Sequence, residues 1–258
     1  MPKNYLFIVE GSDEKNVLSD AFEKYGFNVV KCKEKISVDG FGDFNKDELL
    51  LNNNNIVVIE GPRNRIHDFL LQFDNEFESI EKLFHYNINY FSGIFLIYDV
   101  DHNDNDDIDS MFNKFNDEST GLLLLNVPCL EVLADDFIDD NKYEIKCGHL
   151  REYKKVLNVR HDLNGEQNSI EYIKNHFNKI MIDFLEKNKR DFNSTNVMDH
   201  PYFVKQKNNS INIRCNASKN SYVHFKYFST VLYVAIAYAN NLTSEIDNYQ
   251  NVLSFFNK

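Results

Sequence analysis

The chain has 258 residues, 43% of them hydrophobic, which is enough apolar material for one large domain or two small ones. Its four cysteines, Cys32, Cys129, Cys147 and Cys215, include no Cys-x-x-Cys pair, which excludes a zinc ribbon and a disulfide framework. Free thiols fit a reducing compartment, no basic-then-apolar leader is evident, and the apolar stretch 230–239 is too short to cross a bilayer. We therefore expect a cytoplasmic protein without a membrane partner.

The formal net charge of −12 is unevenly spread along the chain. Residues 1–140 carry a net charge of −18, and residues 141–258 carry +6. The acidic half could hold cations, and the basic half could hold a polyanion. A solvated surface with chance asymmetry would give the same charges, so the charge pattern alone does not decide between these interpretations.

Short apolar runs alternate with longer amphipathic or polar segments in the first half of the chain. In chain order, the expected elements are a strand at residues 5–9, a helix at 12–25, a strand at 27–32, a polar loop at 37–55, a strand at 56–59, a helix at 63–85, a strand at 94–98, an acidic loop and short helix at 103–115, a strand at 122–125 and a helix that Pro128 opens. Strands that are apolar on both faces and alternate with helices predict an α/β domain at residues 1–140, with a mostly parallel sheet flanked by helices.

The second half, residues 141–258, is expected to be a mainly helical, basic region that binds a substrate or partner. The expected helices are residues 150–156, 169–188, 222–239 and 243–256. Between them lies an irregular polar stretch with four cations, Lys205, Lys207, Arg214 and Lys219. These cations, near aromatic residues, suit a nucleic-acid backbone and stacked bases, and a solvated basic loop is an equally good interpretation.

Two of the apolar runs end in carboxylates. The first leads into Glu10 and Asp13, and the second leads into Asp99 and Asp101. Open α/β folds bind ligands where the carboxyl ends of their strands meet, and residues two apart on a strand point to the same side. Glu10, Asp99 and Asp101 at one edge would repel one another unless a hard cation lies between them, and an oxygen-only ligand set suits Mg²⁺ or Mn²⁺. The sequence therefore predicts a divalent metal site at this edge.

An EF-hand calcium loop is the main alternative for the acidic segment after residue 98. Counted from Asp99, position six is Asp104 instead of glycine and position twelve is Ser110 instead of glutamate. Counted from Asp101, position twelve is again not glutamate, and a strand instead of a helix precedes the loop. The EF-hand interpretation therefore fails in both registers, and the trailing acids fit a solvated surface or a looser calcium loop.

Together these motifs resemble the TOPRIM domain, the metal-binding fold of topoisomerases, primases, OLD-family nucleases and small RNA-maturing nucleases. In that family a glutamate follows the first strand and an Asp-x-Asp follows a later strand, and Glu10, Asp99 and Asp101 take these places. Residues 126–131 are similar to the Asn-Pro-Cys-Phe-Glu-like segment of RloB-type defence proteins, with a valine inserted and a leucine in place of the aromatic. The resemblance covers roughly the first half of the chain.

The resemblance implies a nuclease of the RloB/OLD-like or PARIS-type anti-phage effectors. Asp99 and Asp101 would hold Mg²⁺ or Mn²⁺, Glu10 would be a ligand or general acid/base, and Glu131 would add a ligand or orient the attacking water. The substrate would be RNA such as tRNA, or DNA. Relatives of this kind are abortive-infection toxins that an ABC- or AAA-type ATPase partner restrains, and a homodimer through the helical half is a further expectation.

Three other residues are candidate auxiliary groups. Asp13 lies in the first turn of the expected helix, Glu60 precedes a glycine after another apolar strand, and His102 lies beside the Asp-x-Asp motif. The structural alternatives are a helix-start acid, an acid in an ordinary turn and a surface loop histidine. An alternative function is a catalytically silent TOPRIM-like module that binds a partner protein or a regulatory metal.

Overall fold

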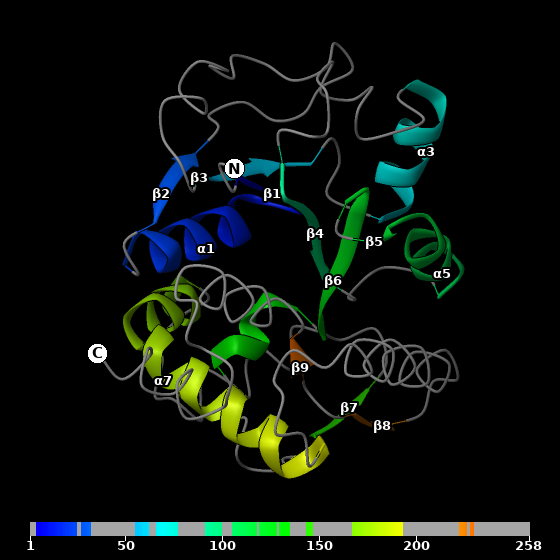
Figure 1. Cartoon of the computed structure of the whole chain (residues 1–258). Helices are drawn as coiled ribbons and strands as arrows, with labels where there is room; N and C mark the ends of the chain where they lie inside the picture. The colour runs from blue at the N-terminus through cyan, green and yellow to red at the C-terminus, as the bar shows by residue number, and fades with distance from the viewer. Residues whose placement is uncertain are drawn as a thin grey trace. The chain divides into compact units, whose positions relative to one another are not determined.

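The structure is a computed structural model of the chain (Figure 1). It describes residues 4–24, 27–31, 55–61, 66–76, 91–99, 105–117, 119–127, 129–134, 143–146, 167–192, 222–225 and 228–229. The chain divides into two compact units, Met1–Leu125 and Asn126–Lys258, and the boundary expected at residue 140 falls within the second of them. Each unit is described by itself below.

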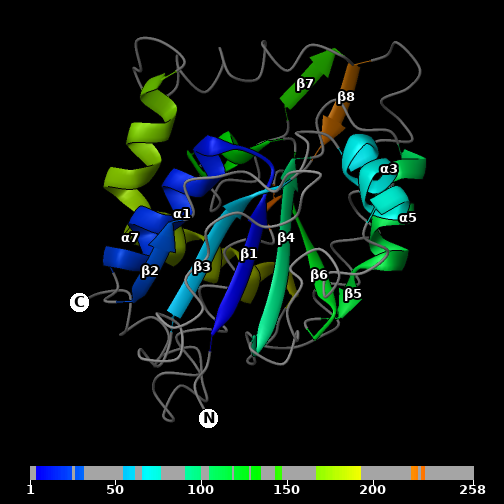
Figure 2. The ribbon, with the colours of Figure 1, turned by 90° about the horizontal axis from the view of Figure 1, so that it is seen from above.

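Six strands that begin in the first unit form one sheet in the order β2-β3-β1-β4-β6-β5 (Figure 2). They are β1 (Tyr5–Val9), β2 (Asn28–Lys31), β3 (Asn55–Glu60), β4 (Gly93–Asp99), β5 (Asn116–Asp117) and β6 (Gly121–Val127). The pairs β2–β3, β3–β1 and β1–β4 are parallel, and β5–β6 is antiparallel. The predicted α/β class with a mostly parallel sheet is confirmed.

The three central strands are buried along their whole length. Every residue of β1, β3 and β4 is buried, including the polar ends Asn55, Glu60 and Asp99. Strands with covered faces read as continuous apolar runs, which is why the sequence pattern predicts these three within a residue of their observed ends. The short edge strand β5 has two exposed polar residues and carries no such signal.

Helices cover both faces of this sheet. They are α1 (Ser12–Lys24), α3 (Ile66–Glu76) and α5 (Asn105–Lys114). The helix predicted at residues 63–85 is described only over α3, and the helix predicted at 12–25 is confirmed by α1. In Figure 2, α3 and α5 lie together, away from α1.

Aromatic contacts identify which helix packs on which face. Phe7 of β1 contacts Phe22 of α1 and Phe95 of β4, in both cases with 5.2 Å between ring centroids. Tyr98 of β4 contacts Phe69 of α3 with a centroid separation of 5.6 Å. Phe95 and Tyr98 are three positions apart on one strand, so they point to opposite faces, and α1 and α3 cover opposite faces of the sheet.

The second unit contains one long helix and several short strands in its described part. Its elements are η2 (Leu130–Ala134), β7 (Tyr143–Lys146), α7 (Gln167–Phe192), β8 (Tyr222–Phe225) and β9 (Phe228–Ser229). Strands β7 and β8 are antiparallel, and β9 pairs with the last two residues of β6. The helix predicted at residues 169–188 is confirmed by α7, which is kinked at His176.

Two predictions for the second unit need correction. The helix expected at residues 222–239 is wrong at its start, because Tyr222–Phe225 is a strand that pairs with Tyr143–Lys146. The helix expected after Pro128 is instead the single 3-10 turn η2. Tyr222-Val223-His224-Phe225 is rich in β-favouring residues, and the cross-strand partner decides its conformation. The helices expected at 150–156 and 243–256 lie outside the described residues.

None of the helices in the described ranges is both long and apolar enough to cross a membrane.

Candidate functional site

The carboxyl ends of three adjacent strands bring acidic residues to one edge of the sheet. In the register of β1 with its neighbours, Val9 lies opposite Glu60 of β3 and opposite Ile97 of β4. Glu10 directly follows Val9, and Asp99 ends β4 two residues after Ile97. Glu10, Glu60 and Asp99 therefore lie at the ends of neighbouring parallel strands, which is where open α/β sheets bind ligands.

The backbone of β4 fixes the side chain of Glu10. Glu10 Oε2 accepts a hydrogen bond of 2.8 Å from the backbone N–H of Asp99, and the backbone N–H of Glu10 donates to the carbonyl of Ile97 at 3.0 Å. A carboxylate accepts hydrogen bonds through both of its oxygens, and the bond to Oε2 orients the Glu10 side chain toward the end of β4. Asp99 is itself 8% exposed, so this part of the edge is largely removed from water.

A further acid, Glu14, lies in the first turn of α1 and is buried. It is 7% exposed, and a Cβ atom built on Gly11 would lie 3.1 Å from Glu14 Oε2, so the carboxylate packs against the glycine that follows Glu10. Asp13, the auxiliary acid expected from the sequence, is exposed to solvent. The burial of Glu14 could have been predicted from its helical spacing. It lies on the same face of α1 as the buried apolar residues, which are Val17, Leu18, Ala21 and Phe22.

Glu60 is held in an ion pair across the edge. Lys15 of α1 places its ammonium 2.9 Å from Glu60 Oε1, and the two side chains are 14% and 6% exposed. Lys15 lies one turn into α1, where its backbone N–H donates to the carbonyl of Gly11. The pair therefore joins the end of β3 to the start of the helix that follows Glu10.

Tyr98 is a buried phenol close to the negative charges of this edge. Its side chain is fully buried, and burial raises the pKa of its phenol well above the ordinary value, with the negative charges of Glu10 and Glu14 raising it further. The hydroxyl finds no hydrogen-bond partner among the described residues. It lies against Gly61, where a Cβ atom would be 2.8 Å from Tyr98 Oη.

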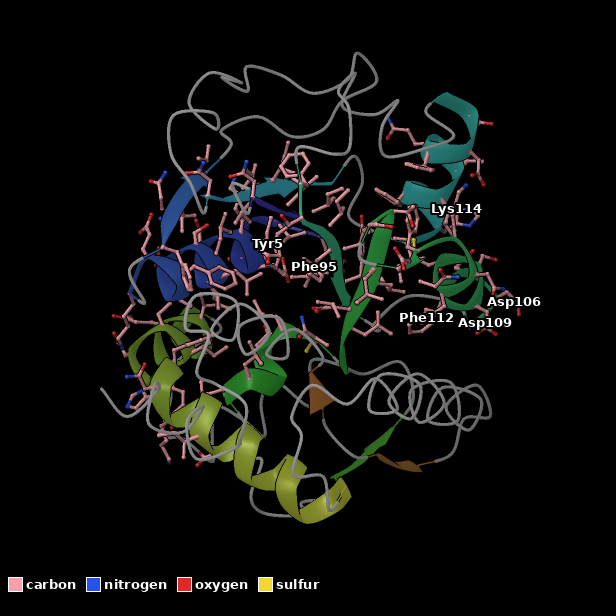
Figure 3. The ribbon with its side chains drawn as sticks, viewed as in Figure 1. Tyr5, Phe95, Asp106, Asp109, Phe112 and Lys114 are labelled. Carbon is pink, nitrogen blue, oxygen red and sulfur yellow. The ribbon has the colours of Figure 1, made fainter. Side chains whose placement is uncertain are left out.

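The acids that trail the Asp-x-Asp motif belong to a helix. Asp106 and Asp107 occupy the first turn of α5, where the helix dipole favours negative charge, and Asp107 pairs with His67 of α3 at 3.1 Å. Figure 3 shows Asp106 and Asp109 on α5, apart from Tyr5 and Phe95 of the sheet. The position of these acids at the start of α5 accounts for them structurally.

Several predicted site residues are not placed by the described part of the chain. Asp101 and His102 lie outside the described residues, and so do the four cations at Lys205, Lys207, Arg214 and Lys219. Glu131 is described in the second unit, where it is a buried residue of η2. The side chain of neighbouring Cys129 is also buried.

Three acidic side chains come to this edge from two strand ends and one helical turn: Glu10, Asp99 and Glu14. Carboxylate oxygens are the donor chemistry that Mg²⁺ and Mn²⁺ prefer.

Comparison of the chain with protein families, with curated proteins and with solved structures finds no match.

Proposed function

We propose that this chain is a Mg²⁺- or Mn²⁺-dependent nuclease whose first unit is a TOPRIM-like catalytic domain. The observation that carries the proposal is the anchoring of Glu10 on the backbone N–H of Asp99 at the ends of two adjacent parallel strands. It supports the part of the predicted motif that joins the first-strand glutamate to the strand end carrying Asp99. The strand order places β1 between β3, which ends in Glu60, and β4, which ends in Asp99.

Different side chains at this edge would bind the cation and accept the proton. Glu10, Asp99 and Glu14 would hold the cation, with Asp101 as the predicted fourth acid. Once bound, the cation would neutralise charge on the scissile phosphate and lower the pKa of a coordinated water. Glu10, oriented by the β4 backbone, would accept a proton from the attacking water. Burial of Asp99 and Glu14 limits competing hydration of their carboxylates.

The nucleic-acid substrate and the biological role follow from the resemblance. We propose cleavage of RNA such as tRNA, or of DNA, by a toxin of an abortive-infection system that an ATPase partner restrains. Lys205, Lys207, Arg214 and Lys219 are the proposed contacts to the phosphate backbone. Glu131 stays a predicted catalytic residue of the second unit, and a Glu131→Gln variant tests it.

A matched pair of variants tests the proposed activity. Purified chain is incubated with total tRNA or plasmid, with Mn²⁺ or EDTA, and cleavage is followed on a gel. We expect Mn²⁺-dependent cleavage to fall at least ~100-fold in Glu10→Ala, because a cation ligand and proton acceptor is lost. Asp106→Ala, which removes an exposed acid of α5, should retain full activity.

A growth assay covers the case of a toxin that is silent without its trigger. Expression of the wild-type chain should arrest growth, and Glu10→Ala should relieve the arrest while Asp106→Ala does not. Equal toxicity of all three chains, or equal cleavage by wild type and Glu10→Ala, would contradict the proposed nuclease. That result would favour the silent module that binds a partner.

A further inference from the structure

We draw no further inference here: the strongest candidate, the buried hydroxyl of Tyr98 packed against Gly61 at the carboxyl edge of the sheet, belongs to the site already described, and nothing in the described part of the chain shows what it would bind.

Discussion

At the scale of single residues, the hydroxyl of Tyr98 packs closely against Gly61 near the acidic edge. The phenol is fully buried, lies in the field of Glu10 and Glu14, and reaches the Cα of Gly61 so closely that a methyl group there would lie 2.8 Å from its oxygen. After the hydroxyl, the nearest atom to that methyl group is the carbonyl oxygen of Val9 at 3.4 Å, an ordinary contact. The glycine after Glu60 is thus required by one oxygen atom.

A double-mutant cycle measures this match. Gly61→Ala should lower the free energy of unfolding by about 1–3 kcal/mol, because a buried methyl group must displace the Tyr98 hydroxyl. In a Tyr98→Phe background the same change should cost at least ~1 kcal/mol less. Urea denaturation of the four chains gives the coupling, and additive effects would show that the alanine is accommodated in another way.

The ionisation of Tyr98 also predicts how stability changes in alkali. The folded-state pKa is raised above the unfolded value of about 10, so the folded state holds the proton more tightly. Stability from this residue is therefore complete below pH ~10 and is lost as pH rises through the folded pKa. Tyr98→Phe cannot ionise here, so in EDTA its alkaline unfolding midpoint, followed by circular dichroism, should lie above that of wild type. Identical midpoints would indicate that other groups govern alkaline unfolding.

At the scale of elements, the α3–α5 face of the sheet is held by an aromatic cluster. Phe69 is fully buried and contacts Phe73, Tyr98 and Phe115 at centroid separations between 5.6 and 5.8 Å. Leu71, two residues further along α3, is 55% exposed. One helix therefore offers a buried and an exposed apolar residue for direct comparison.

Truncation of these two residues should have very different effects. Phe69→Ala should lower the free energy of unfolding by about 3–5 kcal/mol, because it leaves a cavity beneath Tyr98. Leu71→Ala should change it by less than ~0.5 kcal/mol. Chemical denaturation of both variants tests this, and a small effect at Phe69 would mean that α3 contributes little to the stability of the first unit.

At the scale of the whole molecule, the sequence pattern predicts those elements whose environment is uniform along their length. β1, β3 and β4 are buried throughout and read as apolar runs, and α7 has a helical period with Ile173, Phe177 and Ile180 buried. The strands β7 and β8 were missed because each is four residues long and finds its partner far away in the sequence. Contacts of that kind leave little trace in local periodicity.

The residues of the candidate site that lie at strand ends could be predicted from the sequence, and the residue that α1 contributes could not. Glu10 and Asp99 were found because each ends an apolar run, and Glu60 because it repeats the pattern. Glu14 was missed because an acid in a first helical turn already has an explanation in the helix dipole. The partner of Glu60 could not be predicted, since Lys15 and Glu60 lie 45 positions apart.

The hydrogen bond that orients Glu10 comes from a main-chain amide of β4. Every residue except proline carries that amide N–H. The side chain at position 99 can therefore change without loss of the hydrogen bond to Glu10, which lies 89 positions earlier in the chain. The architecture thus separates the scaffold of the site from its chemistry. A substitution that replaces the carboxylate of Asp99 would therefore leave in place the backbone hydrogen bond that orients Glu10.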